Sequence, residues 1–119
     1  MPGARMRRIN EVLREVVGAA ISSDLSDPRI GFVTVTSVET SPDLRTAKVY
    51  VSVLGNEDER EETLSGLRSS HGVLQTRIAA ETRMKRTPTL TFHYDDTIEQ
   101  GVRISQILDE EPAEGEESR

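Results

Sequence analysis

The chain has 119 residues, the size of a single domain, and its 34% hydrophobic content is enough for one lean core without help from a metal or from disulfides. It contains no cysteine, which excludes a disulfide framework and a cysteine-ligated zinc site, and no apolar run is long enough for a membrane span or a signal peptide. The net charge of −6 at pH 7 would disfavour a polyanionic partner if it were evenly spread. We therefore expect a cytoplasmic protein without membrane contact.

The first predicted element is an amphipathic helix that follows a basic opening. Apolar residues recur at intervals of three and four along residues 9–21, which places them on one helical stripe. The stripe contains Ile9, Val12, Leu13, Val16, Val17, Ala20 and Ile21. Arg5, Arg7 and Arg8 come immediately before it, although cations are mildly unfavourable at a helix N-terminus because the macrodipole is positive there. Helix stability therefore does not account for these three arginines.

Two strands are predicted next, and they form an antiparallel hairpin. A loop at residues 26–31 leads into residues 32–39, whose β-branched side chains are typical of a strand. A turn at residues 40–43 separates this strand from a second one at residues 44–54. Alternation along the second strand places Ala47, Val49, Val51 and Val53 on one face, and Lys48, Tyr50 and Ser52 on the other.

A broken pair of helices is predicted after the hairpin. The first begins at Glu57, where an acidic start suits a helix N-terminus, and Leu64 and Leu67 form its buried side, with Gly66 as a weak point. Residues 69–72 interrupt the pattern, and a second helix follows until a proline at position 88 ends it. Its apolar residues are Val73, Leu74, Ile78 and Met84.

A third strand is predicted at residues 89–94, followed by a short helix between residues 98 and 108. The strand places Leu90, Phe92 and Tyr94 on one face. From residue 109 onward the chain is rich in glutamate with proline and glycine, which is typical of a disordered tail. Helices grouped on one face of a three-stranded sheet give an α+β two-layer domain.

The order helix, strand, strand, helix, break, helix, strand is similar to the type II KH arrangement. Four segments resemble the ribosome-binding factor A family. They are RMRRIN at residues 5–10 with the helix that follows, Asp27-Pro28-Arg29 leading into FVTVT at 32–36, SPDLRTAKVYV at 41–51, and PTLTFHYDD at 88–96. The resemblance covers about residues 5–108, which we assign to the KH-like domain. Residues 1–4 are then a flexible N-terminus, and residues 109–119 the acidic tail.

The resemblance implies a KH-like fold and a non-enzymatic function, and from the residues we expect no cofactor or metal. Members of the family bind the 30S ribosomal subunit and its 16S rRNA during late maturation in the cytoplasm, and cold-sensitive ribosome assembly is the associated physiology. We also expect a monomer. The family has an Ala-x-Gly kink between two helices, which corresponds here to Ser70-His71-Gly72. The serine departs from the pattern, and its hydroxyl is a candidate cap for the second helix.

Basic residues are the candidates for RNA contact. Residues 71–86 carry four basic side chains and one acidic one, whereas residues 87–119 carry nine acidic and two basic ones. Phosphate contacts supply most of the non-specific affinity for nucleic acid, and the arginine fork matches phosphate. The candidates are Arg5, Arg7, Arg8, Arg45, Lys48, His71, Arg77, Arg83, Lys85 and Arg86, with Arg83 and Arg86 expected on one helical face. The competing interpretation is that they are ordinary solvated charges.

Motifs for other chemistry are lacking in the sequence. No two of the eight glycines are three residues apart, so a GXXG phosphate clamp is not supported, and there is no P-loop, dinucleotide motif or nucleophile elbow. Tyr50 and Tyr94 are too few for a stacking platform, and the two histidines show no metal-ligand spacing. A protein–protein adaptor is the main alternative, and an enzyme is the least favoured. A further hypothesis is that the acidic tail competes with RNA, so that its removal tightens RNA binding.

Overall fold

The computed structural model describes residues 3–97, which contain three helices and three strands. In chain order they are α1 (Ala4–Asp24), β1 (Val33–Thr40), β2 (Thr46–Val53), α2 (Glu57–Ser69), α3 (His71–Thr82) and β3 (Thr89–Tyr94). This order confirms the predicted succession of elements up to the third strand. The predicted helix at 98–108 and the acidic tail lie outside the described residues. No helix in the described part is long and apolar enough to cross a membrane.

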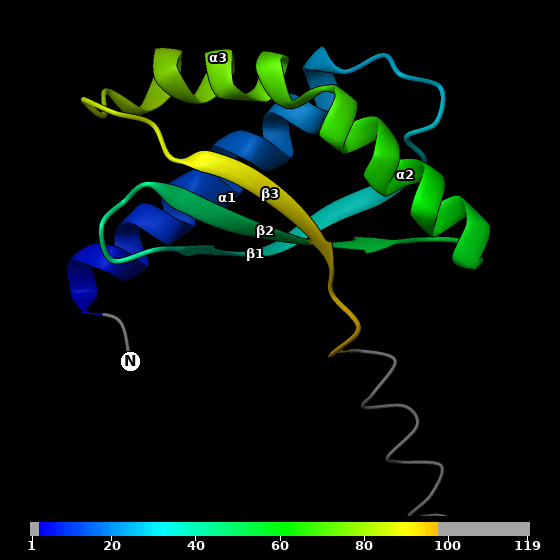
Figure 1. The fold of residues 1–119 in the computed structure, drawn as a ribbon, viewed down its shortest axis with the longest axis horizontal. Coiled ribbons are helices and arrows are strands. Elements are labelled where there is room, and N and C mark those ends of the chain that lie inside the picture. Colours follow the sequence, from blue (N-terminus) through cyan, green and yellow to red (C-terminus); the bar gives the residue numbers. More distant parts are fainter. Residues whose placement is uncertain (1–2, 98–119) are drawn as a thin grey trace, which may run out of the picture.

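The strands form one mixed sheet with β2 at its centre. β1 pairs with β2 in antiparallel orientation, as the predicted hairpin requires, and β3 pairs with β2 in parallel. Val49 of β2 consequently lies between Val38 of β1 and Phe92 of β3. All three helices cover one face of the sheet (Figure 1). The predicted α+β two-layer architecture, with a KH-like order of elements, is confirmed.

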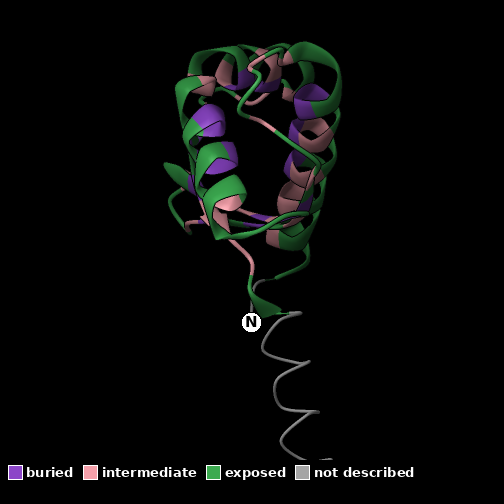
Figure 2. Ribbon diagram, turned by 90° about the vertical axis from the view of Figure 1, so that its right-hand side faces the viewer, coloured by how far each residue is buried: buried purple, intermediate pink, exposed green. Residues whose placement is uncertain are grey.

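The core lies between the helices and the sheet, and the buried sides of the helices face inward (Figure 2). The predicted alternation along β2 is confirmed, because Ala47, Val49, Val51 and Val53 are all buried. The buried residues of α1 are Leu13, Val17, Ala20 and Ile21. Val12 is 39% exposed, because the apolar stripe of α1 is wider than the surface that the helix buries. Leu74 and Ile78 of α3 are fully buried.

α3 ends earlier than the sequence pattern predicts. Its last residue is Thr82, and Arg83 adopts a left-handed conformation with a φ of 57°. A left-handed residue ends the helical hydrogen-bond ladder and turns the chain. The predictions that Met84 belongs to the helix and that Arg83 and Arg86 share a helical face are therefore wrong. Residues 84–86 instead belong to the connection between α3 and β3.

α2 and α3 meet at Ser70, inside the predicted kink at residues 70–72. The Ser70 N–H donates to the carbonyls of Gly66 and Leu67 at 3.0 and 3.1 Å. Its side chain makes no capping hydrogen bond, so the predicted capping role is wrong. Gly66 is buried, and a Cβ at this position would lie 2.7 Å from a side-chain carbon of Ile30. Glycine therefore weakens α2 locally but allows the loop between α1 and β1 to pack against this helix.

Candidate nucleic-acid interface

A hollow of about 500 Å³ opens at one end of the domain. Three segments that are far apart in the sequence form it: the start of α1, the turn between β1 and β2, and the connection between α3 and β3. All three segments lie on the left side of Figure 1, and their residues line the same hollow. The hollow is lined by Arg5, Ile9, Asp43, Leu44, Met84, Lys85 and Arg86, and we call it the basic hollow.

Apolar side chains from all three segments form the floor of the basic hollow. Ile9 lies on α1, one turn after Arg5. Because residues four apart share a helical face, the two side chains line the same hollow. Leu44 comes from the β1–β2 turn, and Met84 from the connection after α3. All three side chains are half-buried. They therefore present apolar surface that a ligand could still cover.

The β1–β2 turn holds Leu44 in a left-handed conformation with a φ of 61°. The Leu44 N–H donates to the Ser41 carbonyl at 2.8 Å, which closes the turn. The left-handed region costs an L-residue roughly 1–2 kcal/mol and is usually left to glycine or asparagine. Backbone preference therefore does not explain a leucine at this position. Its side chain lines the basic hollow, where it contributes apolar surface.

Asp43 adds one carboxylate to a lining that is otherwise basic and apolar. Its Oδ1 accepts hydrogen bonds from the Ser41 hydroxyl at 2.7 Å and from the Arg45 N–H at 3.1 Å. These two bonds, together with the nearby Arg45 charge, lower the pKa of Asp43, so the group is ionised at neutral pH. The other oxygen, Oδ2, lies 3.9 Å from Arg45 Nε in an exposed ion pair. An acceptor of this kind can bind the N–H groups of a ligand.

The three cations of the basic hollow are Arg5, Lys85 and Arg86, and all three are exposed. None of them forms an ion pair or a side-chain hydrogen bond with another residue in 3–97. Like charges gathered around one hollow repel each other, and a bound anion would relieve that repulsion. The structure thus brings together three of the ten residues that the sequence analysis selected for RNA contact.

The other predicted residues lie outside this lining. Arg8 on α1 and Arg83 after α3 are exposed. Arg7 lines a smaller hollow between α1 and β1. Arg45 is largely exposed beside Asp43, and His71 is half-buried at the break between α2 and α3.

Lys48 lies on the sheet face opposite the helices, where it is paired across the strands with Glu39. On the same face, the rings of Tyr50 and His93 lie 5.6 Å apart. Burial, followed by the charges of Lys48 and Arg68, lowers the pKa of His93, so its ring is neutral at pH 7. Lys48 therefore belongs to a different surface from the basic hollow.

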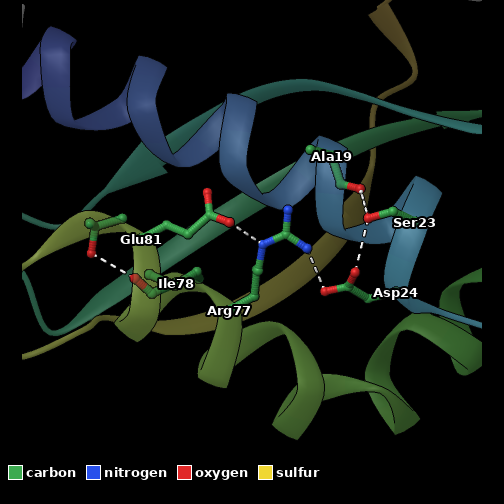
Figure 3. Close-up of polar contacts among 7 residues, drawn as sticks. Ala19, Ser23, Asp24, Arg77, Ile78 and Glu81 are labelled. Carbon is green, nitrogen blue, oxygen red and sulfur yellow. Dashed lines mark hydrogen bonds and ion pairs between the residues drawn. The ribbon is translucent and has the colours of Figure 1, made fainter.

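Arg77 lies in a different environment again, between α1 and α3 (Figure 3). Its Nη1 is 2.5 Å from a carboxylate oxygen of Asp24 at the end of α1, and its Nε is paired with Glu81 one turn further along α3. The hydrogen bonds to Asp24 and Glu81 raise the pKa of Arg77, while those from Arg77 and Ser23 lower the pKa of Asp24. We call this contact the α1–α3 seam. Because two carboxylates already balance its charge, we take Arg77 out of the candidate RNA contacts.

The apolar floor and Asp43 were not predicted from the sequence as parts of a site. From the sequence alone, Ile9 is a core residue, Met84 part of a helix and Leu44 the start of a strand. Their meeting depends on left-handed residues at positions 44 and 83, where the sequence has neither of the residues that favour this conformation. The turn cluster before Leu44 indicates only that the chain reverses. In the described part of the chain, no group of three or more histidine, aspartate or glutamate side chains is placed to hold a metal ion.

Comparisons with known proteins agree on one family. Residues 5–108 match the family model of ribosome-binding factor A. The chain is 43% identical to the ribosome-binding factor A of Halothermothrix orenii, with 100% of this chain and 98% of that protein covered. The crystal structure of ribosome-binding factor A from Thermus thermophilus is similar with a TM-score of 0.68 and 29% identity, over 75% of this chain and 93% of that one. A Thermus thermophilus homology model fitted into the cryo-EM map of a 30S complex has a TM-score of 0.62 and 30% identity, over 72% and 90% of the two chains.

Proposed function

Because the chain belongs to the ribosome-binding factor A family, we propose that it binds the 30S ribosomal subunit by contacting 16S rRNA during late maturation. The similarity to a relative fitted into a 30S complex supports the choice of partner. In this proposal the protein is non-enzymatic, because its effect on the subunit comes from binding alone. We further propose that it acts as a cytoplasmic monomer. The physiology that the resemblance implies, cold adaptation of ribosome assembly, is part of the same proposal.

The observation that carries the RNA contact is the group of three cations around the basic hollow. Arg5, Lys85 and Arg86 have no ion-pair partner within residues 3–97, and they come from two segments that the fold brings together. Each phosphate that a cation neutralises releases condensed counterions, which makes affinity depend on salt. An RNA contact at the basic hollow should therefore weaken steadily as salt increases, although the whole chain is acidic.

The test is co-sedimentation of the full chain with isolated small ribosomal subunits over a salt series, with large subunits as the control. We expect binding to the small subunit alone, and we expect the logarithm of the affinity to fall linearly with the logarithm of the salt concentration. Binding that ignores salt, or that is equal for the two subunits, would contradict the proposal.

One observation favours the adaptor alternative. Phe32 immediately precedes β1 and Leu54 immediately follows β2; they are 79% and 76% exposed, and the Leu54 N–H donates to the Phe32 carbonyl at 3.0 Å. The adjacent start of α2 is acidic, with Glu57, Asp58 and Glu59 in its first turn. An exposed apolar pair beside negative charge suits a basic protein better than RNA. If Phe32→Ser weakens binding to the subunit and the loss of the basic-hollow cations does not, the adaptor interpretation is favoured.

A further inference from the structure

The basic hollow has more structure than phosphate binding alone requires. A phosphate contact needs cations or backbone N–H groups, which can lie on a flat surface. Here three half-buried apolar side chains line the hollow together with three exposed cations, and a volume of about 500 Å³ is within the range of small-ligand pockets. The ligand should therefore have an apolar face, an anionic group and donors that the Asp43 carboxylate can accept. An unstacked nucleotide has all three.

We propose that the basic hollow binds a single unstacked guanine nucleotide of an RNA strand. The base covers Ile9, Leu44 and Met84, while Arg5, Lys85 and Arg86 bind the phosphates on either side of it. Asp43 accepts hydrogen bonds from the Watson–Crick edge of the base. This inference rests on the proposed function in so far as the ligand is RNA, and it adds a base identity that the proposed function does not contain.

The arrangement of charges determines the orientation of the nucleotide in the hollow. The carboxylate of Asp43 repels phosphate, so the backbone is directed toward Arg5, Lys85 and Arg86 and the base toward the turn. An aromatic base covers the floor with a flat apolar face, whereas a polar ligand group placed there would lose its hydrogen bonds to water. Leu44 belongs to this floor although its backbone conformation disfavours leucine.

The preference for guanine comes from the chemistry of the carboxylate. Ionised aspartate only accepts hydrogen bonds. On the Watson–Crick edge, guanine offers two adjacent donors, its ring N1–H and its exocyclic amino group, whereas adenine and cytosine offer an amino group next to an acceptor, and uracil a single N–H between two acceptors. Because Asp43 Oδ1 already accepts hydrogen bonds from the Ser41 hydroxyl and the Arg45 N–H, the turn holds the carboxylate in place and leaves Oδ2 to accept from the two guanine donors.

The test measures binding of the full chain to short fluorescent single-stranded RNA oligomers by anisotropy. One oligomer contains only uracil, and the others replace its central base with guanine, adenine, cytosine or an abasic site, so that length and phosphate charge are constant. We expect the guanine oligomer to bind roughly tenfold more tightly than the uracil oligomer, the abasic one to bind most weakly, and all of them to weaken with salt. Equal affinity for all five oligomers would overturn the inference.

Two variants and one control locate the effect. Asp43→Asn keeps an Oδ1 acceptor for the turn but replaces Oδ2 with a donor, and it should reduce the guanine preference to about twofold or less. Met84→Ser should weaken binding of the guanine oligomer more than binding of the abasic oligomer, because only the base contacts the apolar floor. Arg14→Gln removes a charge from α1 at an arginine paired with Glu11, outside the basic hollow, and should leave the preference unchanged.

The outcomes separate this inference from the proposed function. If the protein still binds small subunits in a salt-dependent way but shows no base preference, or a preference that Asp43→Asn does not change, the guanine site is wrong and the proposed function stands. If the guanine preference is found but small subunits are not bound, the site is supported and the proposed function is wrong. A preference for another base overturns the assignment of Asp43.

Discussion

The α1–α3 seam and the basic hollow both contain cations that one stretch of sequence predicts to contact RNA, but their surroundings differ. In the seam, Arg77 lies between Asp24 and Glu81 and joins two helices. In the hollow, Lys85 and Arg86 have no partner among residues 3–97, although they are only a few positions further along the chain. The fold therefore divides one basic run of sequence into cations that are paired within the protein and cations that are not.

The difference has a direct energetic meaning. To bind a phosphate, Arg77 would have to exchange two carboxylates for one phosphate, and the carboxylates would then be left without their cation. Lys85 and Arg86 give up only water and mutual repulsion. Cations of the same type therefore serve different purposes, and we expect variants of the two regions to affect different measurements.

The largest expected effect comes from removing three positive charges from the basic hollow. The variant with Arg5, Lys85 and Arg86 changed to Gln should lower the affinity for small subunits on the order of 100-fold, since each lost charge-assisted hydrogen bond weakens binding. Its melting temperature should barely change. Co-sedimentation and thermal unfolding measure the two properties.

The matched control also loses three positive charges, but from arginines that bind within the fold. It combines Arg77→Gln with two further substitutions. Arg29→Gln removes the ion pair with Asp27, and Arg68→Gln removes the hydrogen bond to the Phe92 carbonyl. This variant should melt at a lower temperature and retain most of its affinity. Equal losses of affinity in the two triple variants would mean that net charge matters and the hollow does not.

A single substitution in the seam should have a smaller effect, confined to stability. Arg77→Met keeps much of the apolar stem but removes the guanidinium, so α1 and α3 lose their ionic connection and Asp24 loses its main partner. We expect the melting temperature to fall by a few degrees, measured by circular dichroism, and oligomer binding to stay the same. A loss of RNA affinity at unchanged stability would return Arg77 to the set of RNA contacts.

The seam should also respond to acid. Because Arg77 lowers the pKa of Asp24 in the folded protein, the stabilisation is fully present above the ordinary value of 3.8 and is lost as the pH falls through the lowered pKa. Melting temperatures measured from neutral pH into this acidic range should fall less steeply for Arg77→Met than for the parent protein. Parallel curves would show that the ion pair contributes nothing to folding.

The smallest expected effect concerns Arg83, which lies between the two regions. Arg83→Gly should stabilise the protein by about 0.5–1 kcal/mol, because glycine adopts the left-handed conformation without the penalty of a Cβ. Urea unfolding measures this change. Lys85→Gly is the control, since its φ is not positive and glycine should bring no gain. If Arg83→Gly is destabilising, contacts of the arginine side chain outweigh its backbone strain.

The order of the elements and most of the core could be predicted from periodicity, as in β2, where every second residue is buried. The basic hollow could be predicted only in part. Arg5, Lys85 and Arg86 were identifiable as cations, but their lack of partners is a property of the packed fold. The end of α3 at Thr82 was not predictable, because the residue that ends it is an arginine and not the glycine that usually marks such a stop.

The parallel pairing of β3 with β2 has a consequence for how the protein is made. The hairpin of β1 and β2 needs only a short turn to close, whereas β3 must wait until α2 and α3 have crossed over, so its pairing with β2 is the late, non-local step of folding. Residues 84–86 connect α3 to β3, and we expect them to line the basic hollow fully with Ile9 and Leu44 only once β3 is paired. We therefore expect the basic hollow to be completed late in folding. A nascent or partly folded copy, with β3 unpaired, would not yet have the complete site.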